Sequence, residues 1–265
     1  MLCTHCRRVE ATAGDGLCDV CIVATANPRP GSSSGTPAQL RSPVGLGQAT
    51  VVMLVVSAAA GLFALYSILP SYDILSAVSD GAYQDTSGEK LDEADRLLNL
   101  AGHLQFILEI ATAVVFICWF QRVRVNAEVF GPQDHRMRRA WVVWGWFVPV
   151  ANLWIPRRIA ADIWDASAPL PTLSLGDGSR MPSSPHSLLN SWWGLWAAAA
   201  VTDRLSSQSM RRADTPDELR SALGLMGVSE VLWITSAVLA VMFVRRLTRM
   251  QNEKALRGPA ARVAV

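Results

Sequence analysis

Residues 49–69 read ATVVMLVVSAAAGLFALYSIL, a run of 21 residues without a charged side chain. The uncharged stretch around this run extends from Ser42 to Tyr72. An apolar helix of about 20 residues is long enough to cross the hydrocarbon core of a bilayer, which is about 30 Å thick. We therefore predict a membrane-spanning helix at 49–69, and we expect the rest of the chain to be organised around lipid.

The composition agrees with a membrane protein. Of the 265 residues, 51% are hydrophobic and only 17% are charged, whereas ordinary soluble domains have about 25% charged residues. The charged residues lie in blocks between long uncharged stretches, as they do in a chain that crosses a bilayer several times. These values exclude a disordered tail protein, a collagen and a highly charged cytosolic enzyme.

Three further segments are predicted to span the membrane, at 97–120, 188–204 and 222–244. The segment 188–204 reaches spanning length only if Asp203 and Arg204 lie at the far interface. The acidic region between the first two spans is expected to be a loop with helical stretches. We therefore predict the fold class to be an all-α, multi-pass membrane helical bundle with four spans.

The segment 140–156 reads AWVVWGWFVPVANLWIP and is short for a span. It ends at Pro156 and is interrupted by Pro149, which frees a backbone carbonyl that the amide of Asn152 can satisfy. We predict a short re-entrant or interfacial segment here, with a fifth span as the alternative. Residues 156–167 are expected to form an interfacial amphipathic helix, because their apolar side chains recur on one helical face.

The distribution of basic residues predicts the topology, because cytoplasmic loops keep an excess of Lys and Arg. With four spans and a segment 140–156 that does not cross, 18 of the 24 basic residues lie on one side. Five spans give thirteen against eleven, which is almost no bias, and letting 140–156 cross while 188–204 re-enters gives fifteen against nine. The four-span arrangement predicts a multi-pass plasma-membrane protein with both termini cytoplasmic.

Two cysteine pairs near the N-terminus have the spacing of a metal site. Cys3 and Cys6 form one C-x-x-C pair, and Cys18 and Cys21 form the other. Four thiolates at this spacing can close a tetrahedral Zn²⁺ site. We predict that residues 1–24 are a zinc-ribbon-like cytosolic module whose folding depends on the metal. Two disulfides are the alternative in an oxidising compartment.

The segments that flank the predicted membrane domain, 49–247, are polar. Residues 25–48 are rich in Pro, Gly and Ser and are predicted to be a flexible linker. Residues 248–265 are predicted to be a basic cytosolic tail that attracts anionic lipid. Nucleic acid is not expected as a partner, because the cysteine module carries only Arg7 and Arg8 as basic residues.

Three ionisable side chains are predicted to lie inside the membrane. His103 and Glu109 belong to 97–120, and Glu230 belongs to 222–244. Four spans make these two helices parallel, which places Glu230 at a depth between the other two residues. They are expected to form a structural hydrogen bond across a helix interface, which Gln105 shares, with a proton or cation relay as the alternative. Cys118 is expected to be an inert core thiol.

The tryptophans are predicted to anchor the chain at the lipid headgroups, as aromatic residues commonly do. The residues concerned are Trp141, Trp144, Trp192, Trp193 and Trp196. The sequence contains no phosphate-binding loop, metalloprotease motif, nucleophile elbow or dinucleotide fingerprint. We therefore do not expect an enzyme.

An ordered set of short motifs resembles a known family. Its members are Pro149, Asn152, Pro156, then Ile163-Trp164-x-x-Ser167 and Asn190-x-Trp192-Trp193-x-x-Trp196. This order is similar to the uncharacterised actinobacterial membrane family catalogued as domain of unknown function 4328, over about Gln48 to Leu247. The resemblance implies a bacterial plasma-membrane protein, often with a zinc-ribbon-like or proline-rich cytoplasmic head, and it implies no catalytic residue.

Two functions remain open at this point. The first is a non-enzymatic scaffold or regulatory protein whose zinc-binding head meets a cytosolic protein partner, kept close by the linker. The second is a small transporter or proton-coupled channel that uses Glu109, Glu230 and His103.

Overall fold

The computed structural model describes residues 40–81, 88–131, 135–168 and 186–256. Within these ranges the chain forms helices and no strand, which confirms the all-α prediction. The elements are α2 (Val44–Ser79), α3 (Gly88–Phe130), α4 (Trp141–Trp144), the 3-10 helix η2 (Ala151–Leu153), α5 (Ile155–Ser167), α6 (Ser187–Arg212) and α7 (Pro216–Leu256).

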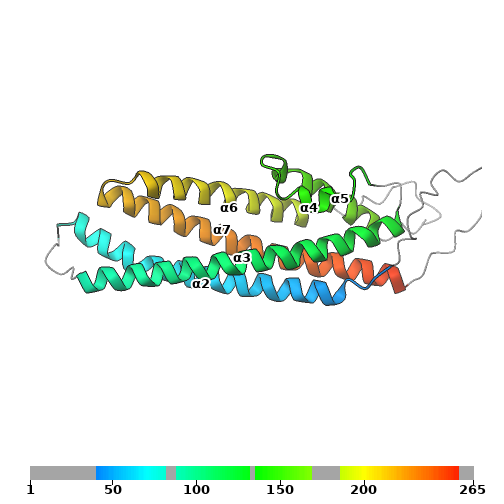
Figure 1. The fold of residues 1–265 in the computed structure, drawn as a ribbon, viewed down its shortest axis with the longest axis horizontal. Helices are drawn as coiled ribbons and strands as arrows, with labels where there is room; N and C mark the ends of the chain where they lie inside the picture. The colour runs from blue at the N-terminus through cyan, green and yellow to red at the C-terminus, as the bar shows by residue number, and fades with distance from the viewer. Residues whose placement is uncertain (1–39, 82–87, 132–134, 169–185, 257–265) are drawn as a thin grey trace, which may run out of the picture. The chain divides into compact units, whose positions relative to one another are not determined.

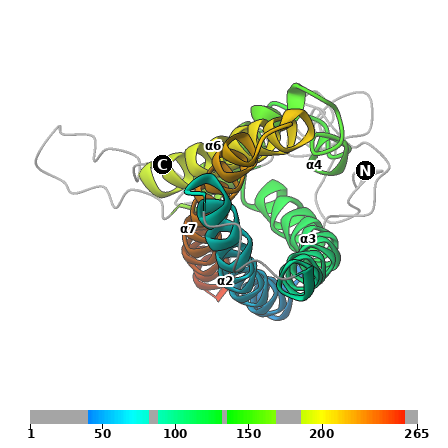
Figure 2. The same cartoon turned by 90° about the vertical axis from the view of Figure 1, so that its left-hand side faces the viewer.

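The four long helices pack side by side. Helix α2 contacts both α3 and α7, and α7 also contacts α6, so that α3, α2, α7 and α6 follow one another around an arc (Figure 2). Sequential neighbours are antiparallel, whereas α3 and α7 run in the same direction, as the four-span arrangement predicts. The beginning of α2 and the end of α7 lie at the same end of the bundle (Figure 1).

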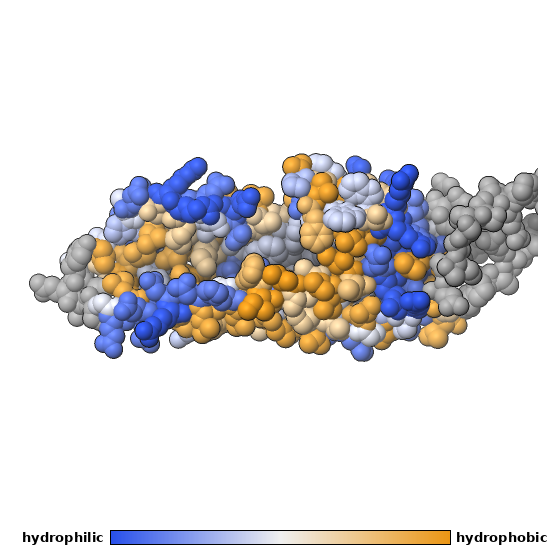
Figure 3. All heavy atoms as spheres, in the orientation of Figure 1, coloured by the Kyte–Doolittle hydropathy of each residue, from blue (hydrophilic) through white to orange (hydrophobic). Residues whose placement is uncertain are grey.

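Three of these helices, α2, α3 and α7, are long and apolar enough to cross a membrane. Helix α6 is not among them, so the fourth predicted span is not confirmed. Its first half carries Asn190 among the tryptophans, and Asp203 and Arg204 lie near its middle, which lowers its mean hydropathy. In Figure 3 apolar surface gathers over the middle of the described bundle, and hydrophilic residues gather towards both of its ends.

The helices extend beyond the predicted spans. Helix α2 begins at Val44, inside the predicted linker, and it continues through Pro70 to Ser79. Its 36 residues correspond to about 54 Å at 1.5 Å per residue, so its ends project beyond a hydrocarbon core of about 30 Å. Helix α7 likewise runs to Leu256, so the first part of the predicted tail is helical and packs against the bundle.

Small residues let α2 approach α7 closely. A Cβ atom added at Gly47 would lie 2.7 Å from Oγ1 of Thr248, and one added at Gly61 would lie 3.0 Å from Cγ1 of Ile234. Such residues are typical of helix interfaces in membranes, where packing replaces the hydrophobic effect between helices. The hydroxyl of Thr248 also accepts a hydrogen bond from Nε1 of Trp119 at 3.0 Å, which links α7 to α3.

A buried polar network joins four segments at the end where α2 begins. The side-chain amide of Gln251, which is 1% exposed, donates to the carbonyl of Val123 at 2.8 Å and to Oγ of Ser167 at 3.1 Å. Its oxygen accepts a bond from Nδ2 of Asn126 at 3.2 Å. Asn126 also bonds both backbone groups of Arg41, at 3.1 and 2.8 Å. This network holds α3, α5 and α7 together and fixes the chain just before α2.

The segment 140–156 does not form a helix long enough to cross a bilayer. It divides into α4, a series of turns and η2. Directly before η2, Val150 has φ 67° and ψ −48°, and the N–H of Ala151 donates to the carbonyl of Pro149 at 2.7 Å. This is a strained γ-turn that a β-branched residue rarely adopts. The carbonyl that Pro149 frees is that of Gly145, four residues earlier, so the predicted bond from the Asn152 amide concerns another group and stays a prediction.

Helix α5 has the predicted amphipathic pattern, but its apolar face packs on protein. Ile159, Ile163 and Trp164 are fully buried, and Trp164 stacks on Phe243 of α7 with 5.8 Å between ring centroids. Pro156 occupies the first turn of the helix, where its missing N–H costs nothing. A helix that was expected to lie on lipid therefore forms part of the core.

Candidate functional site

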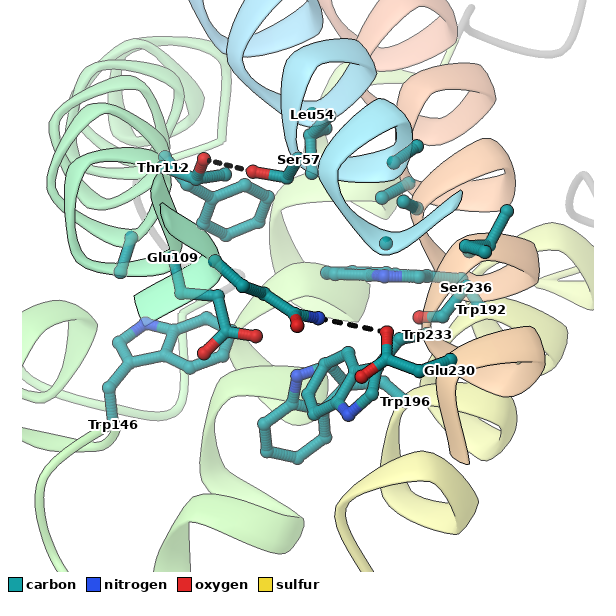
Figure 4. A pocket seen from close by; sticks show the side chains of 18 of the residues that line it. Leu54, Ser57, Glu109, Thr112, Trp146, Trp192, Trp196, Glu230, Trp233 and Ser236 are labelled. Atoms are coloured by element: carbon teal, nitrogen blue, oxygen red, sulfur yellow. Dashed lines mark hydrogen bonds between the residues drawn. The ribbon is translucent and has the colours of Figure 1, made fainter. Parts of the chain in front are cut away.

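A cavity of about 380 Å³ lies between the long helices (Figure 4). Helices α2, α3, α6 and α7 all contribute to its wall, and Trp146 and Phe147 from the turn after α4 close part of it. The cavity occupies the space between α3 and α6, which contact each other little although they face the same opening of the arc (Figure 2).

Aromatic rings form much of the cavity wall. Trp146 packs edge-on against Trp196 at 6.1 Å, Trp196 packs edge-on against Trp233 at 6.4 Å, and Phe116 lies 5.7 Å from Trp192. The interlocked rings hold one another in place, since each aromatic pair contributes about 0.5–1.5 kcal/mol beyond its buried area. The wall is therefore both apolar and rigid.

Glu230 of α7 is the most deeply buried acidic side chain of the cavity, with 5% of its surface exposed. One of its oxygens, Oε2, accepts a hydrogen bond from Nε2 of Gln105 at 2.9 Å (Figure 4). Gln105 lies between His103 and Glu109 in the sequence, so Glu230 lies level with this part of α3, as expected from the parallel course of the two helices. A carboxyl group at such a position needs a partner because its charge is costly in an apolar environment.

Glu109 lines the same cavity from α3, one helical turn after Gln105 (Figure 4). A second hollow continues from these residues between α3, α6 and α7, and it is also lined by Asp203 and Ser206. The two hollows share Gln105, Glu109 and Glu230. The carboxyl groups thus lie where the apolar cavity meets a more polar extension toward the other end of the bundle.

His103 does not join the two glutamates, so this part of the prediction is wrong. Its side chain is exposed, and Nδ1 lies 2.7 Å from the carbonyl oxygen of Asn99 in the preceding turn. With 3.6 residues per turn, a residue two positions before Gln105 lies on nearly the opposite face of α3. Cys118 is exposed as well, because the neighbouring Trp119 and Phe120 take the buried face.

Among the described residues that line either hollow, none is basic. The hydroxyl groups of Ser57 and Thr112 bond each other at 2.7 Å across the α2–α3 contact, so they already satisfy one another (Figure 4). The carboxyl oxygens of the glutamates are therefore the main polar groups offered to a ligand. Chemically, the site is suited to a proton or to another cation with an apolar body.

The tryptophans of α6 correct the anchoring prediction. Trp192 and Trp193 are each 5% exposed and belong to the protein core, and Nε1 of Trp193 donates to the carbonyl of Leu153 at 2.7 Å. Trp196 lines the cavity. Trp141 and Trp144 are exposed and remain compatible with an interfacial position. Indole rings suit both a headgroup layer and a packed interior, so composition alone does not separate the two.

Several members of the site were not predicted, among them Trp146 and Trp233. Asp203 was expected only at the far membrane interface, although it lines the hollow beside the glutamates. One feature of the sequence did indicate a shared polar site, namely the spacing of Gln105 and Glu109, which lie one helical turn apart. The predicted zinc ligands Cys3, Cys6, Cys18 and Cys21 lie outside the described residues. In the ranges that are described, no group of three or more His, Cys, Asp or Glu side chains is arranged to hold a metal ion.

No curated protein and no solved structure matches the chain. The family model described as Domain of unknown function (DUF4328) matches residues 83–249, from just before α3 to near the end of α7. This match starts later than the resemblance predicted, since it leaves out α2, but it contains both glutamates and every aromatic residue named in the cavity wall. Because the match covers more than half of the 265 residues, the chain belongs to this family.

Proposed function

We propose that this protein is a small proton-coupled transporter whose cavity between α3 and α6 holds the transported ligand. The observation that carries the proposal is the position of Glu230, buried at the junction of an apolar cavity and a polar hollow. Acidic side chains inside a membrane are costly and commonly mark proton or ion pathways. Glu109 and Glu230 are the groups that would exchange the proton, and His103 has no part in this step.

The proposed arrangement has four spans, with α6 as the fourth. Helix α6 packs along α7, and Asp203, Ser206 and Ser207 of its second half line the polar hollow. A helix whose polar groups face the bundle interior can cross a bilayer at lower cost than its mean hydropathy suggests. Four crossings place the beginning of α2 and the end of α7 on the same side of the membrane. This agrees with their position at one common end of the bundle.

We further propose that this common end is cytoplasmic in a bacterial plasma membrane. Arginines gather there, on the ends of α3 and α7 and around α5, whereas the opposite end is acidic around the α2–α3 connection. Such an asymmetry is the usual signature of the cytoplasmic side. Protease added to intact cells should leave both ends of the chain uncut, and cleavage of either end from outside would refute this topology.

Proton flux tests the transport proposal. The purified protein is placed in liposomes that contain a pH-sensitive dye, and a potassium diffusion potential is imposed. Wild-type protein should carry protons faster than protein-free liposomes, and Glu109→Gln and Glu230→Gln should remove this difference. Glu253→Gln is the matched control, since Glu253 lies on α7 outside the cavity and half exposed. Wild-type flux equal to that of empty liposomes refutes the proposal.

A second candidate function rests on the cysteine pairs. The spacing of Cys3, Cys6, Cys18 and Cys21 favours a zinc-ribbon-like head, which would make the protein a non-enzymatic scaffold or regulator for a cytosolic partner. Purified protein should then contain about one zinc per chain, and Cys18→Ser should lose the metal while membrane insertion persists. Metal-free wild-type protein with two disulfides would exclude this role.

A further inference from the structure

We propose that the ligand of the cavity is a lipophilic organic cation, with an aromatic or aliphatic body and one quaternary or protonated nitrogen. This inference rests on the proposed function of the cavity as a ligand site, and it names the class of ligand. It follows from the wall, the charges and the small number of free polar groups, which are three separate properties of the described residues.

The wall favours a cation with an apolar body. Trp146, Trp192, Trp196 and Trp233 bring four indole rings to one cavity, and indole is the side chain that binds cations best through its ring face. Cages of aromatic rings bind quaternary ammonium groups by this interaction, which strengthens as water is excluded. A volume of about 380 Å³ is within the range of pockets for small organic ligands, which is about 300–1,000 Å³.

The charges favour a cation over an anion. Glu230 comes from α7, Glu109 from α3 and Asp203 from α6, and the residues that α2 contributes to the cavity are uncharged. No Lys, Arg or His lies among the described residues that line the two hollows, and none of the described ion pairs involves these three carboxyl groups. An anion would meet only like charge there, whereas a cation would gain an attraction that the apolar surroundings screen weakly.

The cavity offers few further polar groups to a hydrogen-bonding ligand. Ser57 and Thr112 are bonded to each other, and the side-chain N–H of Gln105 is bonded to Glu230. Among the described residues of the wall, Trp146 has a buried indole N–H without a partner. A sugar, nucleotide or peptide in this cavity would therefore leave many of its own donors and acceptors unpaired, which costs about 1–3 kcal/mol for each buried group. A body without hydrogen-bonding groups avoids this cost.

A proton and the organic cation compete for the same carboxyl groups. Binding of the organic cation should therefore weaken as the pH is lowered, because protonation removes the charge that attracts it. The acidic groups that face Glu230 from the neighbouring helices are Glu109 on α3 and Asp203 on α6, and α2 contributes no charged group to the cavity. The same competition would couple export of the cation to import of a proton.

The test compares a cation with a neutral molecule of the same shape. Full-length protein in lipid nanodiscs is equilibrated by dialysis with radiolabelled benzyltrimethylammonium, and neopentylbenzene, in which carbon replaces the nitrogen, is the competitor. Empty nanodiscs give the lipid background. The variants are Glu230→Gln, Glu109→Gln at the cavity rim, and Glu253→Gln as the control, each with its unfolding temperature measured.

The proposal expects saturable binding of benzyltrimethylammonium that weakens at least about tenfold in Glu230→Gln, as befits loss of a charge partner in apolar surroundings. Glu109→Gln gives a readable result even where Glu230→Gln fails to fold, and it should also weaken binding, while Glu253→Gln should not. Displacement by neopentylbenzene at equal concentration, or equal binding by all variants, overturns the inference. Binding without proton flux refutes transport but leaves the ligand class standing, and proton flux without binding refutes the ligand class alone.

Discussion

Replacing Gln251 tests the polar network that joins the helices at the end where α2 begins. Gln251 makes three side-chain hydrogen bonds, to Asn126, to the carbonyl of Val123 and to Ser167. Asn126 and Ser167 would each keep other bonds after Gln251→Ala, to Arg41 and to Ile163 respectively. The substitution therefore removes three bonds without leaving these two side chains unpaired.

The expected cost follows from this count. At about 1 kcal/mol net for each bond, Gln251→Ala should lower the free energy of unfolding by about 3 kcal/mol. Asn126→Ala also removes three bonds, two to Arg41 and one to Gln251, and should cost about the same. Because one bond is common to both residues, the double variant should lose about 5 kcal/mol and not 6, which gives a coupling energy of about 1 kcal/mol.

The assay is unfolding in mixed micelles by titration with sodium dodecyl sulfate, followed by tryptophan fluorescence. Gln208→Ala is the matched control, since Gln208 is an exposed glutamine within α6, and it should change the free energy by less than about 0.5 kcal/mol. A Gln251→Ala variant as stable as this control would refute the network as a stabilising element. Full additivity of the two single variants would refute the Asn126–Gln251 bond specifically.

Three further outcomes are expected. Burial lowers the pKa of His135 below its ordinary value of 6.5. The unfolded chain therefore binds more protons than the folded chain below that pH, and the free energy of unfolding should fall as the pH drops below 6.5. A pH series of melting temperatures should show a smaller fall for His135→Asn. Val150→Gly should raise the melting temperature, because glycine adopts a positive φ without the strain of valine, and an unchanged or lower value would contradict the strained turn. Gly47→Ala should destabilise the protein by about 1–3 kcal/mol, because the added methyl group collides with Thr248. Gly45→Ala should not, because no atom lies within 4 Å of a Cβ added there. Equal melting temperatures of the two variants would refute the close α2–α7 contact.

The close contact between α2 and α7 also helps to hold the cavity open. Helix α2 lies close to α7 at Gly47 and Gly61, so α7 is fixed on one side while α3 and α6 remain apart on the other. Gly61 lies next to Glu230, since an added Cβ would be 3.5 Å from its Oε2. The small residues of α2 thus both join two helices and leave room beside the buried carboxyl group.

The sequence by itself determined the class of fold and the order of its long helices. The length of an uncharged run and the position of charged residues are local properties, and a bilayer of fixed thickness converts them directly into spanning helices. The same local pattern predicted the parallel course of α3 and α7 and the depth of Glu230, because depth follows from the count of residues along each helix at a constant rise. The amphipathic pattern of α5 was also visible in the sequence.

Only the tertiary structure decided what each face contacts. An apolar helical face can pack on lipid or on protein, since both are equally free of water, and so α5, Trp192 and Trp193 went to the core and not to the interface. The rotation of α3 turned His103 outward and Gln105 inward, a choice that depends on how four helices share their contacts. The cavity exists because α3 and α6 do not close the arc, and no local pattern encodes a space between segments that lie far apart in the chain.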